Sequence, residues 1–232
     1  MSRVRIGMIA AGALAATATL AMHVAAQTCA GAASYASGPM SVGAGLTIQN
    51  QAKSYGAEFG LGSPSGPFGA VSLARTDYDN VQGGRTGFGV SGGYAVDMNP
   101  AKSVQFCPIA GFAYENGPSI PTGFGNVDIT GHVIGFGGSF GGVATSTPTF
   151  AFVPFASASY MLARANGTFA GTRQSTSQDY EQTEIGAGFV LNRTLTIRPS
   201  VAFPIGLPGG KSTFQLGVGF NFGATTTTRR SR

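Results

Sequence analysis

Apolar and polar side chains alternate strictly along several segments of this 232-residue chain. The clearest segment lies near the carboxyl end, where the residues of one parity are all apolar: Phe214, Leu216, Val218, Phe220 and Phe222. The residues between them are polar or Gly. Because successive side chains of an extended strand point to opposite faces, this pattern predicts a strand with one apolar and one polar face. The same alternation recurs over residues 42–49, 55–62, 88–96, 185–191 and 195–205.

Four less regular segments bring the predicted number of strands to ten. They are expected near residues 67–76, 102–115, 127–143 and 149–164. Helices are not expected, because 37 residues are Gly, and each Gly inside a helix costs up to about 1 kcal/mol relative to Ala. The predicted fold class is all-β, with ten strands or, since the third, sixth and seventh alternate poorly, eight.

The outer face of this sheet is not expected to meet water. Charged residues make up 10% of the chain, against roughly 25% in an ordinary soluble domain. The connections are long at alternate junctions (76–85, 115–126 and 165–178), although those near Gln51 and at 207–211 are short on the same side. Such alternation is typical of outer-membrane barrels. We therefore expect a closed, antiparallel, up-and-down transmembrane β-barrel; a secreted soluble β-sandwich with a polar outward face is the alternative.

Three charged residues lie deep within predicted strands, and all three have the parity of the polar face: Glu58, Glu184 and Arg198. A charge facing lipid near the bilayer midplane would cost about 2–4 kcal/mol, whereas a lumen-facing charge is hydrated or paired. These residues are therefore expected in the lumen. Tyrosine favours membrane interfaces, and five tyrosines fall near predicted strand ends: Tyr55, Tyr114, Tyr160 and Tyr180 on the outer side, and Tyr94 on the inner side.

The first 26 residues have the pattern of a secretory signal peptide. Arg3 and Arg5 precede an uncharged stretch, and small residues end at Ala26, after which cleavage is expected. A membrane-anchoring helix would need about 20 apolar residues, and this stretch is shorter. The remaining chain divides into an N-terminal periplasmic or lumenal segment (27–39), the barrel (40–222) and a flexible C-terminal tail (223–232).

The last predicted strand carries a motif of four residues: Gln215, Gly217, Phe220 and Phe222. A polar residue, Gly two positions later and two aromatics separated by one residue look like the C-terminal insertion signal of outer-membrane barrels. Together with the signal peptide, this motif makes residues 40–222 resemble the small OmpA/OmpX-like proteins of the porin-like superfamily. The resemblance implies a bacterial outer-membrane location, contact with its lipids and insertion by the barrel assembly machinery. Ten residues follow the final aromatic here, whereas family members often end at it.

Cys29 and Cys107 are the two cysteines of the chain. Export would place them in an oxidising compartment, and Cys107 has the inward parity of its strand. Residues 30–39 can extend about 33–36 Å, enough to carry Cys29 into the lumen. We expect a disulfide that pins the N-terminal segment inside the barrel and contributes about 2–4 kcal/mol; two free or partner-linked thiols are the alternative.

Catalytic chemistry finds little support in the sequence. His132 is the one histidine after the signal peptide, and a multi-histidine metal site cannot be assembled. Omptin-like proteases pair Asp with His across the barrel mouth, for which Asp77, Asp79 and Asp128 are the candidates here. We expect no enzyme activity and no cofactor; a barrel-embedded hydrolase acting on lipid or peptide at the outer rim is the alternative.

Charge and barrel size narrow the remaining functions. Without Arg3 and Arg5 the chain has 12 basic and 9 acidic residues, and three of those basic residues lie in the tail. Scattered single charges form no nucleic-acid patch. A ten-stranded barrel is only slightly larger than one filled by its own side chains, far below the open porins. The expected role is structural, surface interaction through the long connections, or restricted passage of small solutes; neither ligand nor solute is specified.

Overall fold

The computed structural model describes residues 28–32, 38–79, 83–122, 125–169 and 172–223. The expected signal peptide lies outside these residues, as does the expected tail apart from Gly223. A short 3-10 helix, η1 (Thr28–Ala30), precedes the strands. The strands are β1 (Met40–Gln49), β2 (Ala52–Gly62), β3 (Gly66–Tyr78), β4 (Arg85–Asp97), β5 (Val104–Thr122), β6 (Gly125–Gly142), β7 (Thr145–Ser146), β8 (Phe150–Phe169), β9 (Thr172–Leu191), β10 (Leu195–Ile205) and β11 (Thr213–Phe222).

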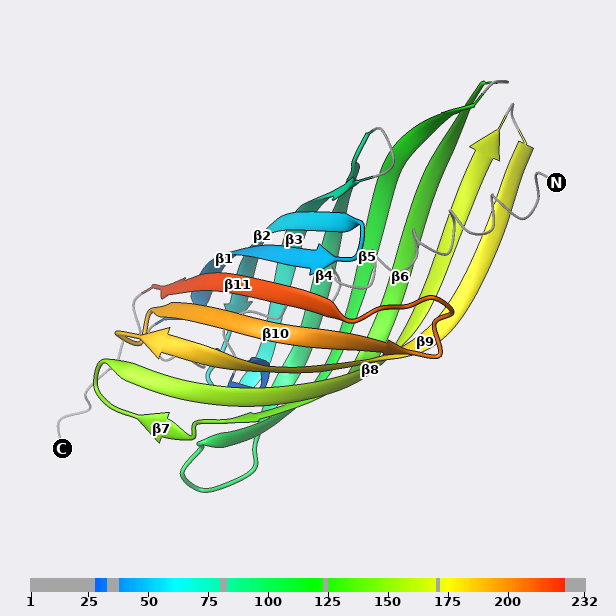
Figure 1. Cartoon of the computed structure of the whole chain (residues 1–232). Coiled ribbons are helices and arrows are strands. Elements are labelled where there is room, and N and C mark those ends of the chain that lie inside the picture. Colours follow the sequence, from blue (N-terminus) through cyan, green and yellow to red (C-terminus); the bar gives the residue numbers. More distant parts are fainter. Residues whose placement is uncertain (1–27, 33–37, 80–82, 123–124, 170–171, 224–232) are drawn as a thin grey trace, which may run out of the picture.

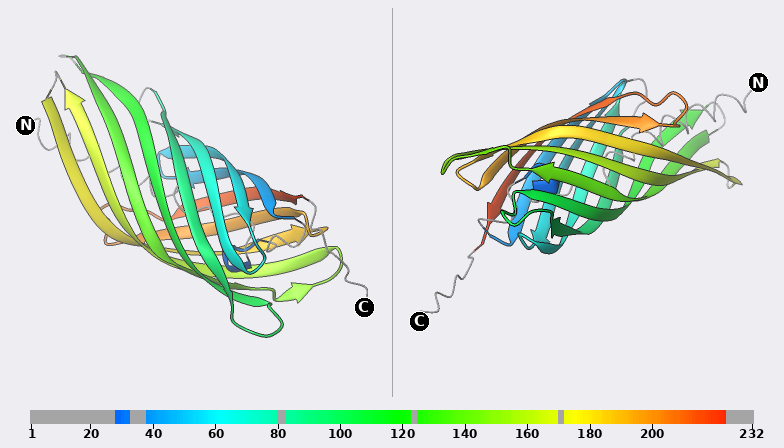
Figure 2. Two further views of the ribbon diagram at one scale, coloured as in Figure 1. Left: turned by 180° about the vertical axis from the view of Figure 1, so that it is seen from behind. Right: turned by 90° about the horizontal axis from the view of Figure 1, so that it is seen from below.

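The sheet closes on itself as a barrel of ten strands. Successive strands pair antiparallel from β1 to β6, β6 pairs with β8, and the order continues to β11, which pairs with β1 (Figures 1 and 2). The closing seam runs from Met40 opposite Phe222 to Ile48 opposite Phe214. β7 pairs only with β8 and belongs to the connection between β6 and β8. The predicted closed antiparallel barrel is thus confirmed, with ten strands rather than eight.

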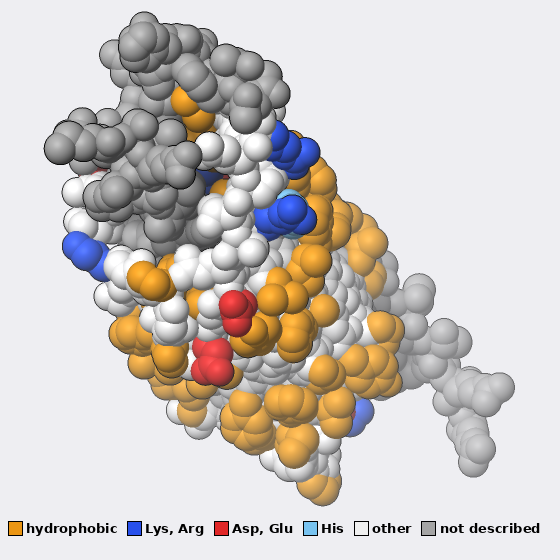
Figure 3. Space-filling view, turned by 90° about the vertical axis from the view of Figure 1, so that its right-hand side faces the viewer, with side chains coloured by type: hydrophobic (Ala, Val, Ile, Leu, Met, Phe, Trp, Pro, Cys, Tyr) orange, Lys and Arg blue, Asp and Glu red, His pale blue; other side chains and the backbone are white. Residues whose placement is uncertain are grey.

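The outside of the barrel is a band of apolar side chains contributed by every barrel strand. Figure 3 shows this band in orange on one face of the molecule. The described strands form one closed sheet, so nothing corresponds to the second layer of the soluble sandwich considered above. Among the described residues, no helix is long and apolar enough to cross a membrane. Representative exposed members are Val42, Phe59, Leu73, Phe88, Phe106, Phe136, Leu162, Ile185, Phe203 and Phe220.

The strands differ greatly in length, which corrects the prediction of long outer loops. β5, β6, β8 and β9 have 18–20 residues, whereas β1, β2, β10 and β11 have 10 or 11. The segments 115–126 and 165–178 are therefore mostly strand, and β3 and β4 also take up both ends of 76–85. Between Thr172 and Asp179 of β9 the side chains are polar on both faces, so alternation disappears there although the backbone remains extended. Figure 1 shows the four long strands projecting past the others at one end, called the outer end here.

The structure also changes the positions expected for three of the five tyrosines. Tyr55 and Tyr94 face outward and are half exposed near strand ends, as an interface position requires. Tyr180 is 3% exposed, because it shares the inward parity of Gln182 and Glu184 on β9. Its expected interface position is wrong. Tyr114 and Tyr160 lie well inside β5 and β8, because these strands continue beyond the barrel.

Candidate functional site

The N-terminal segment crosses the inner half of the lumen as a plug, defined here as residues 28–32. Cys29 is bonded to Cys107 on β5, with 6.1 Å between their Cα atoms. The Ser139 hydroxyl of β6 donates a hydrogen bond to the carbonyl oxygen of Cys29. On the opposite wall, Arg198 Nη1 donates to the carbonyl oxygen of Ala30 at 3.0 Å. The expected disulfide is present, and the segment it pins is held by strands on both sides of the lumen.

Two lumen glycines allow this close approach. A Cβ added at Gly188 on β9 would overlap the carbonyl group of Gly31, and one added at Gly141 on β6 would overlap that of Thr28. Any side chain at these positions would displace the plug backbone. The two glycines therefore form the surface on which the plug packs, called its seat here.

The lumen charges predicted from parity lie beside this plug. Glu184 and Arg198 line a small cavity together with Cys29 and Ala30. Glu58 and Arg198 line a larger one on the other side of the plug, next to Ala32. The Arg198 guanidinium also lies 5.8 Å from the centre of the Phe155 ring. The structure thus places all three charged residues at the lumen face.

The larger cavity has a volume of about 80 Å³. Small residues on β1, β2 and β11 form much of its wall, and they leave little side-chain volume there. The glycines that line it are Gly43, Gly45, Gly56, Gly217 and Gly219.

A buried ion pair near the outer end of the lumen was not predicted. Arg85 Nη1 and Glu115 Oε2 are 2.8 Å apart, and both side chains are 1% exposed. Arg85 Nε also donates to the carbonyl oxygen of Gly117 at 2.8 Å, and its guanidinium lies 5.8 Å from the centre of the Tyr78 ring. Both charges fall in segments interpreted from sequence as loops. Extending the inward parity of the predicted segment 88–96 outward by three residues would have oriented Arg85, and Glu115, the last residue of the predicted segment 102–115, already has the inward parity of its strand.

The residues considered for hydrolysis are not brought together. His132 shares the outward parity of Ile134 and Phe136 on β6, so it points away from the lumen. Asp77 lies on β3, which β4 and β5 separate from β6, and it pairs with Arg75 Nε at 3.0 Å. Asp128 lies on β6 near the outer tip, and Asp79 follows the end of β3. Among the described residues, no group of three or more His, Cys, Asp or Glu could hold a metal ion. The structure therefore gives no support to the Asp/His arrangement considered for the hydrolase alternative.

The C-terminal motif forms most of β11. Gln215 is buried on the lumen face, and Gly217 lines the larger cavity. Phe220 is 47% exposed on the outside, and its ring stacks near that of Phe222, with centroids 6.5 Å apart.

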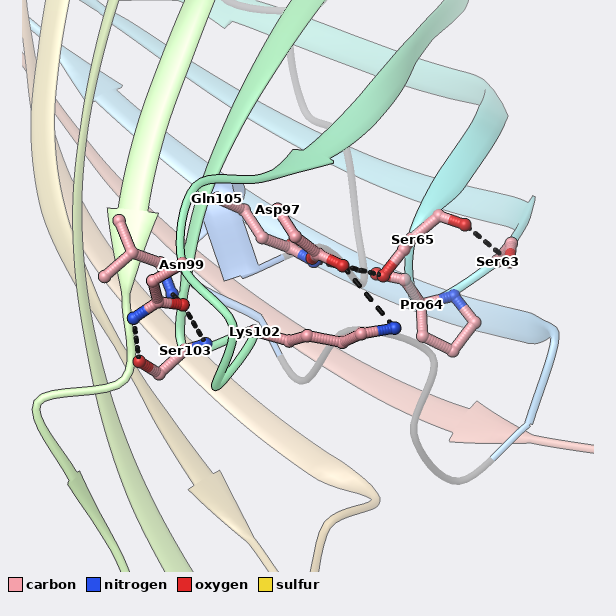
Figure 4. A network of polar contacts seen from close by, with 9 residues as sticks. Ser63, Pro64, Ser65, Asp97, Asn99, Lys102, Ser103 and Gln105 are labelled. Atoms are coloured by element: carbon pink, nitrogen blue, oxygen red, sulfur yellow. Dashed lines mark hydrogen bonds and ion pairs between the residues drawn. The ribbon is translucent and has the colours of Figure 1, made fainter.

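The turns at the inner end are joined by a polar network centred on Asp97, the last residue of β4 and beyond its outward apolar side chains (Figure 4). The Ser65 hydroxyl and the Gln105 amide donate to its two carboxylate oxygens at 2.6 and 2.9 Å. These hydrogen bonds, with Lys102 at 3.7 Å, hold the pKa of Asp97 below its usual value. Gln105 also donates to the carbonyl oxygen of Pro64, so the network fixes neighbouring turns to each other.

Comparison with known proteins gives similarity in fold alone. No protein-family model matches the sequence, and no curated protein matches it significantly. The translocator domain of the autotransporter NalP from Neisseria meningitidis is similar with a TM-score of 0.50 at 10% identity, over 79% of this chain and 87% of that one. The N-terminal β-barrel domain of Pseudomonas aeruginosa OprF gives 0.35 at 15% identity, over 79% and 96%. The attachment invasion locus protein Ail of Yersinia pestis gives 0.36 at 14% identity, over 78% and 95%. The chain has the fold of an outer-membrane β-barrel protein.

Proposed function

We propose that this protein is exported, inserted into a bacterial outer membrane, and acts at the cell surface through its protruding strands rather than as an open channel. The observation that carries the proposal is the exposure of β9 beyond the barrel. Residues 173–177 are exposed at every position, so both faces of this strand meet solvent. Their side chains are Arg173, Gln174, Ser175, Thr176 and Ser177.

This part of β9 belongs to a continuous sheet rather than a mobile loop. It pairs with β8 up to Thr172 opposite Phe169, and β8 pairs with β6 over the same region. β10 reaches only Ile205, opposite Glu181, so β9 continues past it. A rigid sheet with polar groups on both faces presents a binding surface at a low cost in conformational entropy.

The plug supports the proposal that the barrel is not an open channel. It is bonded to β5, held by hydrogen bonds from β6 and β10, and in contact with β9, so four strands around the lumen hold it in place. Passage of sugars or larger solutes would require this segment to move.

Shortening the protruding hairpin tests the surface role. Asn166 and Ser175 pair in register, so deletion of residues 166–175 and closure with an Asn-Gly turn keeps the pairing below them. We expect cells producing the shortened barrel to lose attachment to wells coated with serum proteins, while the full-length protein supports it. Liposomes containing either protein should not swell in isotonic sugar. Equal attachment by the shortened barrel would refute the surface role, and swelling with the full-length protein would refute the occluded lumen.

We further propose that β11 is the signal read by the barrel assembly machinery. Phe222→Ser should lower the amount of folded barrel in the outer membrane severalfold, measured by heat-dependent gel mobility of membrane fractions. Phe214→Ser is the matched control, because it removes the same side chain from the same face of β11, outside the motif. Each loses about 1.5–3 kcal/mol of apolar burial against lipid, so equal defects in the two variants would argue for a stability effect instead.

A further inference from the structure

The outer rim carries two basic side chains that no carboxylate of the described chain neutralises. His132 on β6 and Arg164 on β8 are opposite each other in register and both face outward. Arg164 is exposed and His132 is half-buried. Tyr114 lies opposite His132 on β5, so three side chains with N–H or O–H donors stand in one row across adjacent strands. Side chains directly opposite each other on adjacent strands have Cβ atoms about 5 Å apart.

Three apolar side chains, called the apolar floor here, lie next to this row, two residues closer to the middle of the barrel along each strand. Phe112, Ile134 and Leu162 occupy the corresponding positions of the same three strands. Ile134 and Leu162 are 47% and 43% exposed, and the Phe112 ring lies 6.5 Å from that of His132. Figure 3 shows pale-blue and blue side chains together at the edge of the orange band. A molecule bound here would meet donors at its head and hydrocarbon along its tail.

Some of the other outward charges near the same end have polar partners or oppositely charged neighbours. Arg75 on β3 contacts Asp77 at 3.0 Å, and Lys53 on β2 lies opposite the same Asp77 in register. On β9, Asp179 accepts a hydrogen bond from the Tyr160 hydroxyl at 2.5 Å. Among the described residues, no ion pair joins Asp179 or any other carboxylate to Arg164.

We propose that His132 and Arg164, with Tyr114 beside them, bind the phosphate of an outer-leaflet lipid whose acyl chain lies along Phe112, Ile134 and Leu162. The planar guanidinium fork suits two phosphate oxygens at once, and an imidazole N–H adds a third contact. The apolar floor favours a phosphorylated lipid over a free phosphate ion. This inference rests on the proposed membrane orientation, but not on the proposed role of the protruding hairpin.

Native mass spectrometry of the purified protein in an uncharged detergent tests the site. Dioleoyl phosphatidic acid is the probe, dioleoylglycerol has the same tails without the phosphate, and inorganic phosphate is the soluble competitor. We expect one phosphatidic acid to be retained by the wild-type protein and by the hairpin deletion, no retention of dioleoylglycerol, and no competition by equimolar inorganic phosphate. Arg164→Gln should weaken retention about tenfold, as loss of charge-assisted hydrogen bonds predicts, and His132→Gln should weaken it less.

Arg75→Gln is the matched control, because it removes one exposed positive charge from the outer rim of another face. Unchanged retention in Arg75→Gln, with folding of all variants verified by heat-dependent gel mobility, supports the site. Equal loss in Arg75→Gln and Arg164→Gln would show attraction to overall charge and overturn the proposal. Full retention by Arg164→Gln, or displacement by inorganic phosphate, would also overturn it. Loss of attachment by the hairpin deletion with intact lipid retention would separate this site from the surface role.

Discussion

Gly188→Ala should unseat the plug. The new Cβ would occupy the space of the Gly31 carbonyl group, and the plug cannot withdraw far, because Cys29 remains bonded to Cys107. Overpacking of this kind costs about 1–3 kcal/mol. We expect a lower free energy of unfolding in urea and faster reduction of the disulfide by dithiothreitol, because the displaced segment admits the reagent.

Gly45→Ala is the control for this variant. Gly45 also faces the lumen, but a Cβ there would meet its nearest atom, Leu216 O, at an ordinary 3.7 Å. The two variants add the same methyl group to the lumen wall, and only one adds it beneath the plug. If both change the rate of reduction equally, Gly188 is not a seat for the plug.

Replacing Cys29 and Cys107 together by Ser should cause the largest loss of stability. The disulfide closes a loop with a sequence separation of 78 residues, for which chain entropy gives about 4 kcal/mol. The remaining hydrogen bonds from Ser139 and Arg198 should not hold the plug permanently. We therefore expect both an earlier urea transition and measurable swelling of liposomes in small sugars.

Comparison with the wild-type protein under reducing conditions completes this test. Dithiothreitol should bring the wild-type transition to that of the double variant and leave the double variant unchanged. A barrel that unfolds at the same urea concentration with and without the bond would contradict a stabilising role. A double variant that is less stable yet does not swell would show that the other contacts suffice to close the lumen.

Side-chain parity explains why the inner part of this protein was predictable. Alternation of apolar and polar side chains predicted β10 and β11 and placed Glu58 and Arg198 on the lumen face. It does so because one face of each strand meets lipid and needs apolar side chains, whereas the other meets water. The same rule predicted that Cys107 faces the lumen, and the extended length of residues 30–39 showed that Cys29 could reach it. The structure contains that bond.

The rule failed where both faces meet water. Between Thr172 and Asp179 the side chains are polar at every position, so the sequence resembles a loop although β9 continues through it. Arg85 and Glu115 were missed because each lies just beyond the last apolar outward residue of its predicted strand, although both side chains are buried. The contact between the plug and Gly188 could not be predicted either, because the sequence does not indicate which of the 37 glycines lies against another part of the chain.

The bond between Cys29 and Cys107 also sets an order of events in the life of the chain. It makes a covalent ring that contains β1 to β4, and Cys107 is completely inaccessible in the finished barrel. A protein oxidant cannot reach a thiol enclosed in this way. We therefore expect the sulfur atoms to meet while the first and last strands are still apart, so that the bond forms before the barrel closes.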